Sequence, residues 1–115
     1  MNISKFTQKS VQAVQDLEKV AYEYGNQEIE EEHLLYALLT QEDSLILKLI
    51  EKMEIQKEYF IDTVKKALDA RVKVSGGELR FGQYLNKALV SAEDEAKAMG
   101  DEYVSVEHLF LSMLK

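Results

Sequence analysis

The segment from residue 25 to residue 39 reads GNQEIEEEHLLYALL, and the segment from residue 100 to residue 114 reads GDEYVSVEHLFLSML. Both begin with glycine and carry the run Glu-His-Leu at the same distance from it, and the offset between them is 75 positions. Extended over residues 6–39 and 81–114, this offset gives ten identities in 34 positions without a gap. Self-similarity at a fixed offset is typical of a duplicated structural unit.

The apolar residues of each copy recur at steps of three and four, which is the spacing of one face of an α-helix. The absence of Pro, together with abundant Ala, Leu, Glu, Lys and Gln, also favours helix. We expect Gly25 to end the first long helix as a left-handed C-cap, and the fourth helix to end near Arg71. The four apolar stripes are Val11, Val14, Leu17, Ala21 and Tyr24; Leu34, Leu35, Leu38 and Leu39; Leu45, Ile46, Leu49, Ile50 and Met53; and Phe60, Ile61, Val64 and Leu68.

The one plausible linker is residues 72–79, which have Ser75-Gly76-Gly77 at their centre. The predicted fold is therefore all-α: two tandem, pseudo-symmetric helical repeats packed as one globular domain. We name them repeat one (residues 1–71) and repeat two (residues 80–115). Repeat two stops after the counterpart of the second helix of repeat one. We therefore expect repeat two to be incomplete and the intact protein to continue with at least two more helices.

Length, charge and composition exclude several classes of protein. The 115 residues suffice for one domain of ordinary size. The 14 Lys+Arg against 21 Asp+Glu give a formal charge of −7, so we expect neither nucleic acid nor an anionic membrane as a partner. The lack of Cys excludes disulfides and thiolate metal sites. No apolar run approaches the roughly 20 residues of a membrane span, and no signal peptide is recognisable, so we expect a cytoplasmic protein.

A Glu-x-x-His spacing at Glu30 and His33 is the one pattern that suggests a metal, because helix bundles use it to bind iron or manganese. Repeat two has Ser105 in place of the first Glu, so the paired motif that a di-metal site needs is missing. We predict no metal site and no catalytic residue in this chain.

The same positions have a structural interpretation. Glu30 and Ser105 are placed to be helix N-caps, and Glu32 and Glu107 then fall in the first turns, where the helix dipole favours negative charge. The histidine that follows each of these glutamates is expected to be buried and hydrogen-bonded to the backbone.

Motifs for nucleophilic catalysis and phosphate binding are also missing from the sequence. No serine stands in a strand-turn-helix elbow. Gly76-Gly77 is followed by Glu78 rather than by the Gly-Lys-Ser/Thr of a P-loop. We therefore expect this chain alone neither to hydrolyse ATP nor to be an enzyme, which leaves surface recognition as its predicted role.

The residues that carry the duplication resemble the Clp N-terminal repeat domain, the leading domain of the Clp AAA+ unfoldases. The stretch Lys5-Phe6-Thr7-Gln8-Lys9-Ser10 is most similar to the ClpB disaggregases. The other matching stretches are residues 24–26, 29–39 and 100–109.

The resemblance implies a domain that binds exposed segments of unfolded or aggregated proteins before a homohexamer threads them. It places ATP and Mg in the ATPase modules of the full-length protein, not in this fragment, and implies a DnaK-type chaperone system as partner. It assigns substrate binding to Thr7, Asp101 and Glu107. The ClpC branch implies, as an alternative, an adaptor- or phosphoarginine-binding pocket at Glu32 and Glu107.

Three positions depart from the family pattern. Glu54 stands where relatives commonly have Gly before the fourth helix, so we expect that turn to differ or the third helix to run on. Ser91 and Glu95 stand where the ClpB-type substrate groove can be apolar. The lining of that groove is therefore not transferred to this chain.

Overall fold

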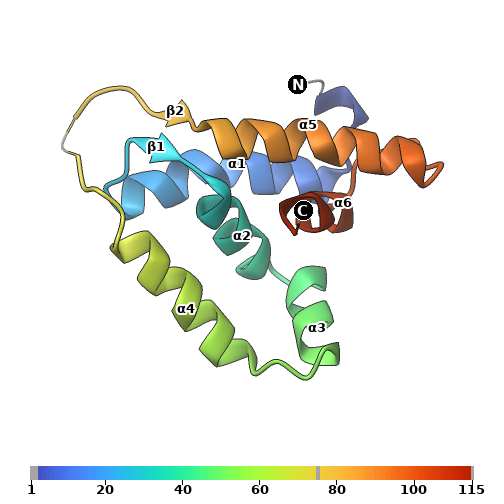
Figure 1. Cartoon of the computed structure of the whole chain (residues 1–115), viewed down its shortest axis with the longest axis horizontal. Helices are drawn as coiled ribbons and strands as arrows, with labels where there is room; N and C mark the ends of the chain where they lie inside the picture. The colour runs from blue at the N-terminus through green and yellow to red at the C-terminus, as the bar shows by residue number, and fades with distance from the viewer. Residues whose placement is uncertain (1–2, 75, 115) are drawn as a thin grey trace.

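The computed structural model describes residues 3–74 and 76–114 and is built mainly from helices (Figure 1). This confirms the predicted all-α fold class. In chain order the elements are η1 (Ile3–Lys5, a 3-10 helix), α1 (Gln8–Glu23), β1 (Glu28–Ile29), α2 (Glu31–Leu39), α3 (Leu45–Lys52), α4 (Lys57–Asp69), β2 (Arg80–Phe81), α5 (Gln83–Ala98) and α6 (Val106–Met113). Within this described part of the chain, no helix combines the length and the apolar character needed to cross a membrane.

The two repeats have the same local structure. α5 begins and ends 75 residues after α1, and α6 begins 75 residues after α2. Gly25 and Gly100, which follow the two long helices, have φ angles of +69° and +74°. The next backbone N–H donates to the carbonyl five residues earlier, from Asn26 at 2.9 Å and from Asp101 at 2.8 Å. This is a Schellman motif, which favours glycine because of its positive φ, and it confirms the predicted end of the first helix.

Short parallel strand contacts join the repeats reciprocally. Ile29 of β1 pairs with Phe81 of β2, and Val104 pairs with Phe6. The offset of 75 relates Ile29 to Val104 and Phe6 to Phe81. Each repeat therefore offers the other the same pair of positions, as in an isologous contact about a two-fold axis.

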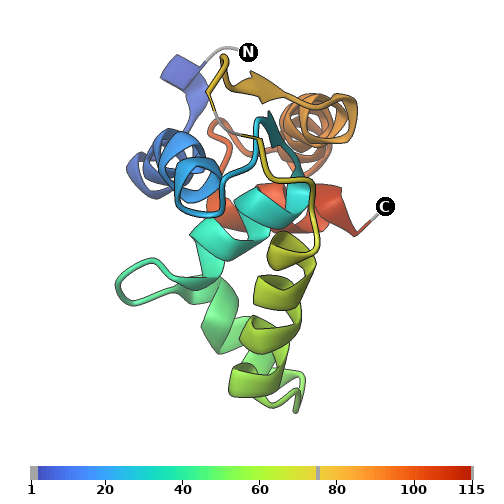
Figure 2. The same cartoon turned by 90° about the vertical axis from the view of Figure 1, so that its left-hand side faces the viewer.

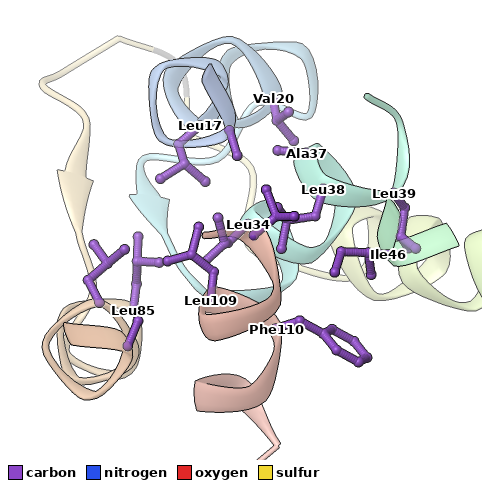
Figure 3. Packing of buried hydrophobic residues seen from close by; sticks show 14 of the residues in the cluster. Leu17, Val20, Leu34, Ala37, Leu38, Leu39, Ile46, Leu85, Leu109 and Phe110 are labelled. Carbon is purple, nitrogen blue, oxygen red and sulfur yellow. The ribbon is translucent and has the colours of Figure 1, made fainter. Parts of the chain in front are cut away.

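The helices form layers around one core. α1 and α5 occupy one layer, with α2 and α6 packed beneath them and α3 and α4 at the far side (Figures 1 and 2). Apolar side chains from all of these helices fill the space between them, and Figure 3 shows those from α1, α2, α3, α5 and α6. Leu34 and Leu109, which the offset relates to each other, are both fully buried there.

The turn after α3 keeps the shape of the other helix ends although it has no glycine. Glu54 has a left-handed φ of +62°, and the N–H of Ile55 donates to the carbonyl of Ile50 at 3.2 Å. α3 ends at Lys52, so the expectation that the third helix runs on is wrong, and the turn has the geometry of the turns that follow α1 and α5. The Schellman geometry is retained with a residue for which the left-handed conformation costs about 1–2 kcal/mol.

Candidate functional site

Each of the two histidines is the buried third residue of a helix, His33 in α2 and His108 in α6. Nδ1 of each ring accepts the backbone N–H of the N-cap residue, Glu30 or Ser105, at 2.9 Å. The prediction that these histidines are packed and bonded to the backbone is confirmed, as are both N-caps.

The second nitrogen of each histidine fastens the loop that precedes the helix. His33 Nε2 lies 2.9 Å from Asn26 Oδ1, and His108 Nε2 lies 2.9 Å from Asp101 Oδ2. Because Nδ1 accepts a hydrogen bond in both rings, Nε2 carries the proton and donates. Burial lowers the pKa of His33, and the positive charge of Arg71 lowers it further. His33 is therefore neutral near pH 7.

This geometry places Asp101, one of the predicted substrate residues, against a buried ring. Its side chain is 49% exposed while it accepts from His108. Because a carboxylate has several acceptor positions, Asp101 can bond to His108 and to a partner at once. It lines a surface cavity of about 420 Å³ together with Lys5, Glu93, Ala96, Lys97, Glu102 and Val104.

Thr7 and Glu107, which belong to opposite repeats, line one cavity of about 390 Å³. The cavity lies where the N-termini of α1 and α6 meet the loop between α2 and α3. Its other lining residues are Gln8, Lys9, Gln41, Asp43, Leu45, Ser105 and Val106. The fold thus brings together two of the three predicted substrate residues, while Asp101 lies in the separate cavity. We call the first one the Thr7–Glu107 cavity.

Thr7 also starts a helix. It is the N-cap of α1, and its Oγ1 accepts the N–H of Ser10 at 3.3 Å. The buried hydroxyl of Ser10 in turn donates to the carbonyl of Val104, at 2.7 Å. A substitution at Thr7 therefore changes a helix cap as well as the cavity wall.

The two equivalent glutamates, Glu32 and Glu107, have different surroundings. Glu32 Oε2 lies 2.7 Å from Nη1 of Arg71, whose Nη2 lies 3.5 Å from Glu28 Oε1. Glu107, by contrast, forms no ion pair or side-chain hydrogen bond with the part of the chain that the structure describes. The role of Arg71 was missed in the sequence, because nothing in a helical pattern indicates which carboxylate a residue 39 positions away will reach.

A third hollow, which the sequence did not predict, is apolar. It has a volume of about 330 Å³ and lies between α2, α3, α4 and α6; its lining residues are Glu31, Glu32, Leu35, Ile50, Met53, Ile55, Phe60, Phe110, Met113 and Leu114. Burial raises the pKa of Glu31, and the carboxylates of Glu30 and Glu32 raise it further.

Both repeats line this hollow. Leu35 of α2 and Phe110 of α6, which the offset of 75 relates to each other, both face it. α3 packs against α6 as well as against α2. The periodicity shows that each helix has an apolar face but not which face is covered, so it gave no signal for the hollow.

The Glu-x-x-His motif is engaged in hydrogen bonds. Glu30 Oε1 accepts the N–H of Leu85 at 2.8 Å, and both ring nitrogens of His33 have partners. Among the described residues, no group of three His, Cys, Asp or Glu side chains is arranged to hold a metal ion.

Comparison with protein families and curated proteins identifies clear relatives. Residues 5–115 match the family described as the Clp repeat (R) N-terminal domain. The chain is 40% identical over 120 residues to the chaperone protein ClpB of Nitratidesulfovibrio vulgaris. The aligned region covers 100% of this chain and 14% of that protein. It is also 40% identical over 114 residues to the chaperone protein ClpB of Porphyromonas gingivalis, and that aligned region covers 99% of this chain and 13% of that protein.

Solved structures show the same fold at lower identity. The Hsp104 N-terminal domain from Candida albicans has a TM-score of 0.83 and 19% identity, over 96% of this chain and 74% of that one. The N-terminal domain of the ClpV1 ATPase from E. coli has a TM-score of 0.86 and 20% identity, over 96% of this chain and 68% of that one. At these identities the likeness concerns the fold alone.

Proposed function

The chain belongs to the Clp repeat (R) N-terminal domain family, and from this we propose that it is the substrate-engaging N-terminal domain of a ClpB-like AAA+ chaperone. In this proposal it binds exposed segments of unfolded or aggregated polypeptides before the ATPase modules thread them. Those modules, with their ATP and Mg, lie outside these 115 residues. Assembly into a homohexamer and cooperation with a DnaK-type chaperone system belong to the full-length protein.

The observation that carries the proposal is the Thr7–Glu107 cavity. Both repeats contribute to it, and its wall mixes apolar side chains such as Leu45 and Val106 with the amides of Gln8 and Gln41. Apolar side chains of an extended polypeptide can pack against the first kind, and its backbone groups can bond to the second. A shallow mixed surface of this kind suits weak binding to many sequences better than tight binding to one.

In this proposal the chain binds polypeptide without catalysing a reaction on it. Ser105, His108 and Asp101 have the residue types of a hydrolytic triad, with Ser105 Oγ 3.0 Å from Nδ1 of His108. The same Nδ1 already accepts the backbone N–H of Ser105. A ring nitrogen has a single lone pair, so His108 is poorly placed to take the proton of the hydroxyl.

Magnetic resonance titration of the isotope-labelled chain tests the proposal. The ligand is a protein kept unfolded by reducing and blocking its disulfides. We expect amide shifts clustered around Thr7 and Glu107 and a weaker interaction for Glu107→Gln, which removes charge at constant size. Glu18→Gln, on the exposed face of α1, is the matched control. Shifts elsewhere only, or equal effects of the two substitutions, would reject the cavity as the binding site.

The second candidate is a ClpC-like domain that binds an adaptor or phosphoarginine. The observation in its favour is the repeated glutamate before each histidine, of which Glu107 has no partner within the described part of the chain. Titration with a phosphoarginine peptide separates the two candidates. Shifts confined to Glu32 and Glu107 with that peptide, and none with the unfolded protein, would favour the second.

A further inference from the structure

His108 is the buried centre of a chain of hydrogen bonds whose two ends reach the surface. Its side chain is 4% exposed. Nδ1 accepts the backbone N–H of Ser105 at 2.9 Å and lies 3.0 Å from the Ser105 hydroxyl, while Nε2 donates to Asp101 Oδ2 at 2.9 Å. Ser105 lines the Thr7–Glu107 cavity, and Asp101 lines the cavity of about 420 Å³, which we call the Asp101 cavity. One ring therefore bonds to the walls of both cavities.

The two cavities adjoin along the strand contact between Phe6 and Val104. The N–H of Thr7 donates to the carbonyl of Val104 at 2.9 Å, and the N–H of Val104 donates to the carbonyl of Lys5 at 2.7 Å. Lys5 and Val104 line the Asp101 cavity, whereas Thr7 and Ser105 line the Thr7–Glu107 cavity. Because neighbouring residues of the same two segments line different cavities, one polypeptide can reach both.

The equivalent histidine of repeat one has buried partners. His33 Nε2 donates to Asn26 Oδ1 at 2.9 Å, and Nδ2 of Asn26 donates to the carbonyl of Val72 at 3.1 Å. Asn26 is 3% exposed, and Glu30, whose N–H is accepted by His33 Nδ1, is 6% exposed. The side chain of Asp101, by contrast, is 49% exposed. The same motif therefore ends inside the fold in repeat one and at the surface in repeat two.

We propose that His108 is a positioning residue of the site for unfolded polypeptide, and that it joins the Thr7–Glu107 cavity and the Asp101 cavity into one binding surface. The inference rests on the proposed function, and we call the bound polypeptide the client. Because the N–H of Ser105 uses the lone pair of Nδ1, the Ser105 hydroxyl is left to donate to a client carbonyl. The bond from Nε2 uses one oxygen of Asp101, so the other oxygen can accept a client N–H. Extended backbone offers both groups at every residue except proline, which suits binding to many sequences.

The two ends of this chain of hydrogen bonds are coupled because both bonds share one ring. Hydrogen bonds in series polarise one another, so a client bond at Asp101 changes the charge at Nε2 and, through the ring, the acceptor strength of Nδ1. The ring of His108 is too buried for the client to contact it. A change at its nitrogens on binding therefore reports an effect that Asp101 or Ser105 transmits.

The test is a magnetic resonance titration of the wild-type chain in which only the histidine side chains carry the nitrogen label. The chain has two histidines, so His33 is the internal control. The ligand is the protein kept unfolded by reducing and blocking its disulfides. We expect the ring nitrogen signals of His108 to shift until the site is saturated, and those of His33 to stay in place. Stationary His108 signals, or equal shifts of the two rings, would overturn the inference.

Two substitutions at His108 each keep one half of the arrangement. In His108→Asn the amide oxygen takes the place of Nδ1 and accepts from Ser105, whereas in His108→Gln the amide nitrogen takes the place of Nε2 and donates to Asp101. We expect each variant to bind the client more weakly by about three- to tenfold, because each breaks the link between the cavities.

His33→Asn and His33→Gln are the matched controls, since they remove the same bonds from the other repeat. They should bind the client within about twofold of the wild type. Equal losses at the two positions, or wild-type binding by both His108 variants, would overturn the inference. The titration of the labelled wild type needs no substitution, so it decides the question where a variant does not fold.

The proposed function has a separate readout, the backbone amides around Thr7 and Glu107 in a uniformly labelled sample titrated in parallel. Amide shifts there without a shift of the His108 ring would overturn this inference alone. The absence of any amide shift would reject the proposed function, and this inference with it.

Discussion

Glu30 Oε1 accepts the backbone N–H of Leu85 at 2.8 Å, so a side chain of repeat one caps a helix of repeat two. Leu85 is the third residue of α5, whose own N-cap, Gly82, has no side chain to offer. At the equivalent place in repeat one, Thr7 caps α1 with its own hydroxyl, and Ser105 stands where Glu30 stands in the other repeat. The two repeats thus solve the same capping problem with different residues.

The first prediction concerns replacing the residues that cap α5 by the residue types that cap α1. Gly82→Thr alone should destabilise the domain by about 1–3 kcal/mol, because a Cβ at this position would overlap the carboxyl group of Glu30. Glu30→Ser alone should cost about 1–2 kcal/mol, since the N–H of Leu85 loses its acceptor. The double variant copies repeat one, so it should be more stable than the sum of the single losses by about 1 kcal/mol or more. Urea denaturation of the four proteins measures this, and additive losses would show that the two positions do not interact.

The left-handed residue after α3 gives the second prediction. Glu54 has a φ of +62°, a conformation that glycine adopts without steric cost. Part of the gain from Glu54→Gly is offset by the greater freedom of glycine in the unfolded chain, so we expect a stabilisation of about 0.5–1 kcal/mol. Thermal unfolding should show a higher midpoint. Asp43→Gly, at a residue whose φ is +55°, should change the stability in the same direction. A loss of stability in both variants would contradict this account of the turn.

The buried histidine of repeat one gives the third prediction. Burial lowers the pKa of His33 below its usual value of 6.5, and the positive charge of Arg71 lowers it further. At pH values between the lowered pKa and 6.5, the unfolded state therefore binds more protons than the folded state. The contribution of the neutral His33 ring to the free energy of unfolding is therefore complete above pH 6.5 and decreases as the pH falls below 6.5. The slope from this group is at most about 1.4 kcal/mol per pH unit.

Urea denaturation at a series of pH values, for the wild type and for His33→Gln, measures that slope. The variant should be less stable at neutral pH, because the ring's two hydrogen bonds are lost, and should lose less stability on acidification. Parallel curves for the two proteins would show that His33 does not titrate differently in the folded state.

Much of the fold was predictable from the offset of 75. The apolar spacing and Gly25 locate the first helix and its end, and the offset transfers both to repeat two. Those features are local, so a single stretch of sequence carries them. The reciprocal pairing of Ile29 with Phe81 and of Phe6 with Val104 is not local, and only the packed structure reveals it.

The candidate site was predictable only in part. Residue type and position pointed to Glu32 and Glu107 as an equivalent pair, and both lie in first turns as expected. Their difference depends on where Arg71 places its guanidinium, which follows from how residues 72–74 are bonded to the loop before α2. Likewise, Thr7 shares a cavity with Glu107 because the pseudo-two-fold packing brings α1 and α6 together at their N-termini.

Asp101 gives the fourth prediction. Asp101→Asn reproduces the arrangement of repeat one, where the amide oxygen of Asn26 accepts from His33. Stability should therefore change by less than about 0.5 kcal/mol, while any contribution of the carboxylate to client binding is lost. Asp101→Ala should lose the bond to His108 and destabilise the domain by about 1–2 kcal/mol. Thermal unfolding and client titration of both variants check this. If Asp101→Asn binds clients as well as the wild type, the charge of Asp101 has no part in client binding.

The central claim is that Thr7 and Glu107 form one binding surface for unfolded polypeptide. The most direct measurement is the dissociation constant of an unfolded protein for the wild type, Thr7→Asn, Glu107→Gln and the double variant. Asn keeps an N-cap acceptor at position 7, so α1 stays intact while the cavity wall changes. We expect each single variant to bind more weakly by about three- to tenfold, and the double variant to lose less than the product of the two, because the residues share one site. Four dissociation constants within about twofold of one another would contradict the claim.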